Sequence, residues 1–382
     1  MAQKNAERIN NFAINLFKKE FENNVENFCI SPVSVFYTFA MMANGDDRRS
    51  RDEILDILGY PKGEEGLYEL NIFANALLRE TTQFEGETQF GFTNSIWHRP
   101  SISLLPKFCT DIKDIYGGMI HPIWLGDENG RTAINTFVYN QTRGITNTFL
   151  NNTDITNLTF VNTPYFTGSW KIPFSNESGE KKQFDNYYGA YTQTSFLSTS
   201  ACEIESAEIE FPSYDYLGSY SRRIRIIRLP YEGDNYTMTI IQPIPFTIRA
   251  FEDLLKALDN DALTSYGSAL CKESIRLWIP KFKSVFNKDI LPTLISMGFY
   301  YVRTQGLSKI SDEVIVLRKF PHAVTITVDE PNTTRNFNAI QETSRSKVDA
   351  TKTLLVNSPF VYMIQDTLSG SILLIGVLIN FK

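Results

Sequence analysis

The spacing of apolar residues in the first 150 positions is typical of amphipathic helices. In "NAERINNFAINLF", apolar residues recur at intervals of three and four, which places Ile9, Phe12, Ala13, Leu16 and Phe17 on one helical face. The segment "SPVSVFYTFAMMANG" begins with a serine and a proline and ends at a glycine, the start and stop signals of a helix. The segments "SRDEILDILGY" and "TAINTFVYNQTRGI" predict two further helices.

From Phe160 onwards the pattern changes to one that is typical of strands. Runs of β-branched and aromatic residues are bounded by Pro, Gly, Asp and Asn, as in "LTFVNTPYF", "RIRIIRLPY", "YTMTIIQPI", "SIRLWIPKF", "VIVLRKF", "AVTITVDE", "FVYMIQD" and "ILLIGVLINF". Helical patterns are sparse here, with "TIRAFEDLLKAL" and "KDILPTLISMGF" as examples. Helices followed by strands predict an α+β fold. Because no linker rich in Pro, Gly and Ser divides the chain, we expect one domain over residues 1–382, helix-rich in 1–155 and strand-rich in 156–382.

One long segment near the C-terminus has almost no apolar pattern. The stretch from His322 to Ile364 has strand-like ends, and about 25 residues rich in Asn, Thr, Ser, Arg and Lys lie between them. Loops of this length are uncommon in compact domains and are usually functional. The sequence therefore predicts an exposed functional loop that a protease can reach.

Composition and charge narrow the classes of function. The chain is 42% hydrophobic and 21% charged, which is ordinary for a globular protein. A net charge of −6 argues against nucleic-acid binding, because that normally needs a basic surface. No run of about 18 apolar residues exists, so we expect no membrane span. The N-terminus has neither the apolar core nor the cleavage site of a typical signal peptide.

The residues that usually carry enzyme chemistry form no recognisable motif. Cys29, Cys109, Cys202 and Cys271 are scattered, which predicts reduced and mostly buried thiols and no zinc site. No histidine lies in a G-x-S-x-G or H-E-x-x-H motif, and no glycine-rich phosphate loop exists. The three residues of a Ser-His-Asp site need to be close only in the folded protein, so the sequence does not exclude such a site. We expect no enzyme, no cofactor and no metal.

Arginines alternate along the predicted strand "SRRIRIIR". This pattern favours a solvated strand face, and a small-anion or glycosaminoglycan site is the alternative.

Several ordered motifs along nearly the full chain resemble the serpin family. The segments "NFCISPVSVFYTFAMMANGDDRRSRDEILDILG" and "LTFVNTPYFTGSWKIPF" are similar to the family's N-I-x-x-S-P-x-S-I and L-V-L-V-N-A-I-Y-F-K-G-x-W-x-x-P-F motifs. "INTFVYNQTRGITNTF", "IIRLPYEGDNYTMTIIQP", "IPKFK" and "NSPFVYMIQDTLSGSILLIGVLIN" match further family segments in order. The resemblance implies a serpin fold of three β-sheets and about nine helices, with an exposed reactive-centre loop at about residues 330–357.

The resemblance also implies a mechanism. A serine protease cuts the loop and forms an acyl-enzyme, and the loop then inserts as a new strand and distorts the protease. The family holds the receiving sheet closed by a buried polar cluster called the shutter, whose matching positions here are Ser31, Ser34, Asn162 and His322. Gly168 and Trp170 match an aromatic cap at the top of that sheet.

The hinge, the first part of the loop to insert, departs from the inhibitory pattern. Inhibitory serpins resemble "EEGTEAAAAT" there, whereas this chain has "DEPNTTRNFNAI". Glu330 and Thr333 match, while Pro331 replaces a glutamate and Asn332 a glycine.

Alternation along an inserted strand decides which hinge side chains would become buried. The family's phase makes Thr333, Arg335, Phe337 and Ala339 the inward set. Burying an unpaired arginine costs several kcal/mol, and overpacking by Phe337 costs about 1–3 kcal/mol. Two effects reduce these costs of insertion: the arginine side chain can extend its charge to the edge of the sheet, and the new strand forms additional hydrogen bonds. The hinge therefore predicts slowed insertion.

The scissile bond follows from the family's spacing. It lies about sixteen residues after Glu330, at Ser346, and a slip of one residue gives Arg345 or Lys347. The two basic residues favour a trypsin-like or furin-like protease, and a chymotrypsin-like protease that tolerates lysine is the alternative. Another interpretation is that these residues are only solvated loop charges.

Two functions follow from the resemblance. The first is a serine protease inhibitor that acts as a suicide substrate and forms a covalent acyl-enzyme complex. The alternative is a non-inhibitory serpin, a carrier, chaperone or binding protein, which the hinge favours. We expect a monomer that is cytoplasmic or unconventionally secreted, and the sequence does not favour glycosaminoglycan binding.

Overall fold

The computed structural model describes residues 2–46, 49–82, 88–146, 148–150, 157–172, 174, 180–215, 218–329 and 352–381. The chain divides into two compact units. The first comprises Met1–Asn24, Ile30–Phe166 and Val285–Thr325, and the second comprises Val25–Cys29, Thr167–Ser284 and Ile326–Lys382. The single-domain organisation stays a prediction.

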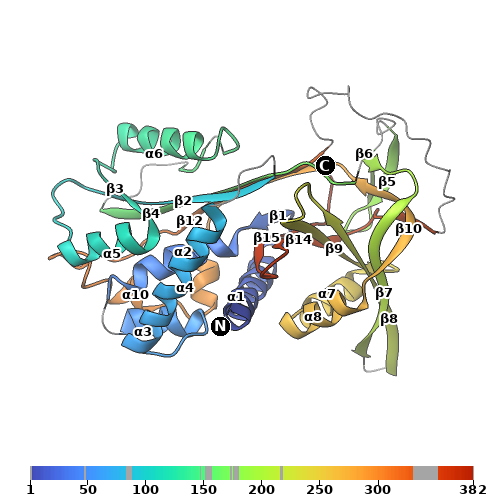
Figure 1. Ribbon diagram of the computed structural model, residues 1–382, viewed down its shortest axis with the longest axis horizontal. Coiled ribbons are helices and arrows are strands. Elements are labelled where there is room, and N and C mark those ends of the chain that lie inside the picture. Colours follow the sequence, from blue (N-terminus) through green and yellow to red (C-terminus); the bar gives the residue numbers. More distant parts are fainter. Residues whose placement is uncertain are drawn as a thin grey trace. The chain divides into compact units, whose positions relative to one another are not determined.

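The first unit contains most of the helices (Figure 1). They are α1 (Ala2–Asn23), α2 (Pro32–Ala43), α3 (Arg49–Ile57), α4 (Glu64–Thr82), α5 (Pro106–Tyr116), α6 (Glu128–Gln141), α9 (Leu291–Ser296) and α10 (Tyr301–Thr304). Helix α2 begins where the sequence predicts, because the Ser31 side chain accepts a hydrogen bond from the Ser34 backbone and Pro32 occupies the first helical position. All twelve of its residues are buried, so this helix lies inside the core.

A three-stranded sheet crosses the same unit in the order β3-β2-β4. Its strands are β2 (Gln89–His98), β3 (Met119–Pro122) and β4 (Leu158–Thr167), and β2 and β3 are parallel. Figure 1 shows α6 lying over these strands, and its buried Ile134 and Val138 belong to one core cluster with Val161 of β4. The same cluster contains Trp97 of β2, so α6 packs on the parts of β2 and β4 that carry Trp97 and Val161.

The strands β11 (Phe282–Asp289) and β12 (Pro321–Val328) form a separate two-stranded sheet. Ala323 of β12 nevertheless belongs to the same core cluster as Val161 of β4. Among the described residues, β4 and β12 therefore share a core cluster but lie in different sheets.

The second unit contains most of a ten-stranded sheet and the helices α7 (Ile248–Ala257) and α8 (Asn260–Ala269). The strand order is β1-β15-β14-β9-β8-β7-β10-β6-β5, and β13 pairs with β10 off this path. Strands β7 and β8 form the long hairpin visible in Figure 1. The bounds are β1 (Phe28–Ile30), β5 (Lys181–Asp185), β6 (Tyr191–Ser198), β7 (Cys202–Asp215), β8 (Gly218–Pro230), β9 (Tyr236–Ile244), β10 (Cys271–Pro280), β13 (Lys352–Leu355), β14 (Phe360–Asp366) and β15 (Ile372–Leu378).

The α+β class is confirmed, with three sheets and ten helices among the described residues, where the family resemblance implies about nine helices. One strand prediction is wrong, because the segment "VIVLRKF" from Val314 to Phe320 forms no strand. Ile315 pairs with Leu307 in an isolated bridge, and the Leu317 N–H donates to the Val302 carbonyl over 3.4 Å. The segment Val314–Phe320 therefore has no neighbouring strand with which it pairs continuously. None of the described helices combines the length and the apolarity that a membrane crossing requires.

Candidate functional site

The predicted hinge and scissile residues lie outside the described residues. They are Glu330, Pro331, Asn332, Thr333, Arg335, Phe337, Ala339, Arg345, Ser346 and Lys347. The structure does describe both flanks, which end at Asp329 and begin again at Lys352. The distal flank corrects a boundary, because Lys352–Leu355, assigned above to the loop, forms strand β13.

Three of the four predicted shutter residues lie together in the first unit. The backbone N–H of Ser31 donates to Nε2 of His322 over 3.1 Å, and the backbone N–H of Ser34 donates to Oγ of Ser31 over 3.3 Å. All three residues are buried, with at most 2% of their surface exposed. The start of α2 is thereby bound to the start of β12.

His322 is held in its neutral form. Burial lowers the pKa of this imidazole to about 3. Because Nε2 accepts a hydrogen bond, the ring proton resides on Nδ1. A nitrogen occupied by a backbone donor is not free to act as a general base, so this arrangement supports a structural role.

Asn162, the fourth predicted shutter residue, forms its hydrogen bond with Asn94 and not with the other three. Its side-chain Nδ2 donates to Oδ1 of Asn94 on β2, and Asn94 Nδ2 in turn donates to the Tyr116 carbonyl over 2.8 Å. Oδ1 of Asn162 is buried without a hydrogen-bond partner. The pair ties β4 to β2 and α5, and the membership of Asn162 in one cluster with His322 stays a prediction.

Asn94 is a residue that sequence reasoning missed. It lies in "GFTNSIWH", where a polar side chain interrupts the buried end of β2 and is only 2% exposed. A buried amide requires partners, so this interruption was the available signal.

The proximal flank of the loop segment is held in the second unit by Trp170. Its indole N–H donates to the Asp329 carbonyl over 3.2 Å, and its ring stacks on Tyr231 with centroids 4.4 Å apart. Lys281 forms an ion pair of 3.2 Å with the Asp329 carboxylate. Asp329, the last described residue before the loop, is therefore held through its backbone carbonyl and through its carboxylate.

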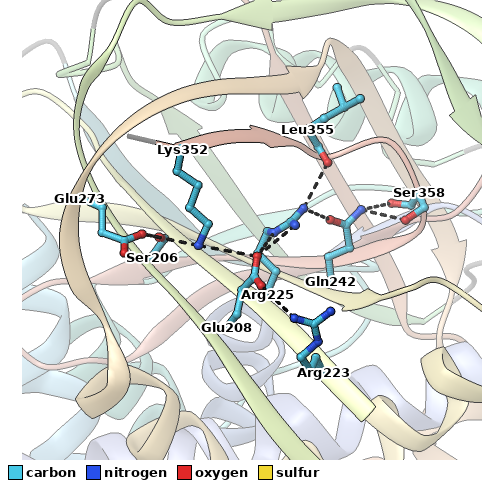
Figure 2. A network of polar contacts seen from close by, with 9 residues as sticks. All are labelled: Ser206, Glu208, Arg223, Arg225, Gln242, Glu273, Lys352, Leu355 and Ser358. Atoms are coloured by element: carbon cyan, nitrogen blue, oxygen red, sulfur yellow. Dashed lines mark hydrogen bonds and ion pairs between the residues drawn. The ribbon is translucent and has the colours of Figure 1, made fainter. Parts of the chain in front are cut away.

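The distal flank is anchored by ion pairs between Lys352 of β13 and acidic residues of neighbouring strands (Figure 2). This strand pairs in parallel with β10 from Lys352 to Leu355. The Lys352 ammonium lies 3.7 Å from the Glu208 carboxylate and 3.5 Å from that of Glu273. Ser206 donates a further hydrogen bond of 3.2 Å to Glu273. We call Lys352, Glu208, Glu273 and Arg225 the β13 anchor.

Arg225 joins this anchor to the following backbone. Its guanidinium donates twice to Glu208, each over 3.1 Å, and once to the Leu355 carbonyl over 3.3 Å. Gln242 continues the network to Ser358, whose hydroxyl lies 2.8 Å away (Figure 2). Burial opposes ionisation of Glu208, but its hydrogen bond with Arg225 and the neighbouring positive charges lower its pKa overall. The anchor carboxylate is therefore ionised at neutral pH.

The arginines of the "SRRIRIIR" strand have acidic partners. In the β7–β8 register Glu205, Glu208 and Glu210 lie opposite Arg228, Arg225 and Arg223. Arg225 keeps only 17% of its side chain exposed. The prediction of a solvated strand face is wrong for Arg225, whose guanidinium is paired inside the anchor. This pairing reduces the positive charge that an anionic polymer would contact.

The described part of the chain contains no group of three His, Cys, Asp or Glu residues that could hold a metal ion. All four cysteines are free thiols. Cys29 is buried and burial raises its pKa to about 12, whereas Cys271 is exposed.

Comparison with protein families shows one match that spans nearly all of the chain. A family model described as "Serpin (serine protease inhibitor)" matches residues 7–381. A relative named neuroserpin from Mus musculus is 25% identical over 93% of this chain and 86% of its own length. Serine proteinase inhibitor 1 of rabbitpox virus is 26% identical over 92% of this chain and 95% of its own length.

Solved structures show the same fold at lower identity. Native protease nexin-1 with heparin superposes with a TM-score of 0.85 at 20% identity, and the match covers 100% of both chains. Thyroxine-binding globulin in complex with thyroxine superposes with a TM-score of 0.84 at 19% identity, covering 99% of each chain.

Proposed function

Because this chain belongs to the serpin family, we propose that it inhibits a serine protease of trypsin-like or chymotrypsin-like specificity as a suicide substrate. The observation that carries this proposal is the division of β4 and β12 between two sheets, although Val161 and Ala323 share one core cluster. Strands that share a core without pairing can accept a new strand, which would satisfy backbone groups along its length.

The proposed reaction begins as ordinary proteolysis. The protease serine Oγ attacks a carbonyl carbon in the window Arg345–Lys347, the C–N bond breaks, and the new amine leaves with the C-terminal segment. An ester then joins the protease serine to the cut loop. Insertion of the hinge beside β4 competes with water for this ester, and inhibition results when insertion is faster.

The two flanks support this reaction physically. Trp170 and Lys281 hold Asp329, at which the insertion would begin. The β13 anchor holds the other flank through Lys352 and the Leu355 carbonyl. A loop fixed at both ends presents its bond to a protease with less conformational entropy to lose.

Incubation with a panel of serine proteases tests the proposal. Denaturing gels should show a covalent complex with at least one trypsin-like or chymotrypsin-like enzyme. Mass spectrometry of the released C-terminal peptide should place the cut within Arg345–Lys347. Cleavage by every enzyme that reaches the loop, with no trapped complex, would show that the chain is a substrate and not an inhibitor.

A non-inhibitory function is the second candidate. Pro331, Arg335 and Phe337 disfavour fast insertion, and the fold is shared with thyroxine-binding globulin, a protein solved with bound thyroxine. Under this alternative the protein is a carrier, a chaperone or a binding protein. The same gel assay separates the two candidates, because a carrier yields cleaved protein alone.

A further inference from the structure

A pocket of about 530 Å³ lies in the first unit, and no residue of the loop, the predicted shutter or the β13 anchor lines it. Helix α9 forms one side through Leu291, Pro292 and Ile295, and the irregular segment 316–318 forms the other. Pockets that hold small organic ligands usually measure about 300–1,000 Å³. The space therefore suits a small molecule better than a folded partner.

The base of this pocket is fixed by Asp289. Its Oδ1 accepts the Leu291 N–H over 3.0 Å and the Phe320 N–H over 2.8 Å. The Ile290 N–H also donates to the Phe320 carbonyl over 3.0 Å. These three bonds join the start of α9 to Phe320, two residues after the irregular segment, so the two sides of the pocket are held at a defined separation.

Five of the eight residues that line the pocket are apolar. Leu291 and Leu317 are only 5% and 6% exposed, whereas Val316 keeps 37% of its surface exposed. The segment around Val316 forms no strand. An apolar side chain at a pocket mouth loses contact with water when a hydrocarbon ligand covers it.

Two guanidinium groups complete the lining. Arg303 extends from α10 and Arg318 from the irregular segment, and both line the pocket. Within the described ranges, neither side chain has an ion-pair partner. Two arginines and the Asp289 carboxylate leave one net positive charge, and the Asp289 Oδ1 is already engaged by two backbone donors. Arginine is well suited to a carboxylate, because its planar group can donate two parallel hydrogen bonds.

We propose that this pocket binds a small amphipathic organic anion, with its carboxylate between Arg303 and Arg318 and its hydrocarbon tail against Leu291, Ile295 and Val316. Both arginines are exposed, so a carboxylate can reach them from solvent while its hydrocarbon tail covers the apolar part of the lining. No residue of the loop lines this pocket, so the proposal does not require that the chain traps proteases.

Calorimetric titration with octanoate and with octanamide tests the charge requirement. The two probes have nearly the same shape and differ in the negative charge. The wild-type protein should bind octanoate at least about tenfold more tightly than octanamide, a difference of about 1.4 kcal/mol. Equal affinities, or no binding of octanoate at millimolar concentration, would overturn the proposal.

Variants locate the site. The double variant Arg303→Gln, Arg318→Gln should reduce octanoate affinity to that of octanamide. Arg276→Gln is the matched control, because Arg276 is an exposed arginine on β10 in the second unit. An unchanged octanoate affinity in the double variant, or an equal loss in the control, would contradict the assignment. Unfolding curves of each variant establish that the fold is intact.

Hydrogen exchange supplies a readout that does not depend on substitution. Octanoate should slow amide exchange in 293–296 and 316–319 of the wild-type protein. Protection that is confined to another part of the chain would place the ligand elsewhere and refute the site.

Discussion

At the scale of single residues, His322 illustrates how burial sets chemistry. Its side chain accepts the Ser31 N–H, and its pKa is lowered to about 3 because the charged ring would lose hydration inside the core. The protein therefore carries a histidine that remains neutral at pH values where a free histidine is protonated. The ring therefore accepts a hydrogen bond as a neutral group.

This pKa predicts a loss of stability in mild acid. At pH values well above its ordinary pKa of about 6.5, the histidine is neutral in both the folded and the unfolded state and has no effect on stability. As the pH falls from 6.5 towards 3, the unfolded chain binds a proton that the folded protein excludes, so the free energy of unfolding drops by about 1 kcal/mol per pH unit. Urea unfolding at pH 7 and at about pH 5 should show this slope.

His322→Gln provides the comparison, because its Oε1 can replace Nε2 as the acceptor. The variant should be less stable at neutral pH and should show a weaker dependence on pH. An identical pH dependence in both proteins would mean that another group causes the acid sensitivity.

At the scale of elements, β13 is a short strand that depends on side chains beyond its own pairing. It contributes four residues to the pairing with β10, and Lys352 and Arg225 add contacts to Glu208 and to the Leu355 carbonyl (Figure 2). Arg225 and Glu208 are largely buried, whereas Lys352 keeps 34% of its side chain exposed. The contributions of the two basic residues should therefore differ.

Arg225→Ala should lower the free energy of unfolding by about 2 kcal/mol, because it leaves a mostly buried carboxylate without its main partner. Lys352→Ala should lower it by less than about 1 kcal/mol, because the ion pair is partly solvated. Denaturant unfolding of both variants measures which substitution lowers the free energy of unfolding more. A larger effect for Lys352→Ala would mean that the charge of Lys352, and not the guanidinium, holds the strand.

The hinge is the second element with a testable property. Arg335→Ala together with Phe337→Ala should raise the fraction of protease encounters that end in inhibition. Smaller inward side chains remove a desolvation cost and an overpacking cost. The rate of insertion therefore rises relative to the rate of hydrolysis of the ester. The stoichiometry of inhibition measures this fraction.

Asn336→Ala with Asn338→Ala is the matched control, because alternation places these two side chains on the opposite face. It should leave the stoichiometry unchanged. If the two double variants behave alike, alternation along the hinge does not govern insertion.

At the scale of the whole molecule, the proposed mechanism predicts that cleavage stabilises the protein. A cut between Ile340 and Lys347 frees the hinge to pair with existing strands and to satisfy its backbone groups. Melting curves before and after limited proteolysis should differ by tens of degrees, far more than the few degrees that about 1 kcal/mol produces. An unchanged melting temperature would show that Pro331, Arg335 and Phe337 have disabled insertion.

Local patterns in the sequence predict several elements well. The Ser31 cap and Pro32 start α2 where expected, and Thr247 caps α7 at the start of the predicted "TIRAFEDLLKAL" helix. The same approach failed at Val314–Phe320, where strand-forming residues find no strand partner. Strand propensity reports a residue that suits a half-buried surface, and a strand exists only where a neighbouring chain supplies hydrogen bonds.

The sequence by itself determined the class of fold and the family resemblance, because periodicity, caps and motifs act over a few residues. Only the tertiary structure decided the partners of the polar side chains. Asn94 meets Asn162 across 68 residues, and Arg225 reaches the Leu355 carbonyl across 130. No local pattern specifies such pairs, since a buried charge or amide is bound by whichever partner the packed core brings within about 3 Å of it.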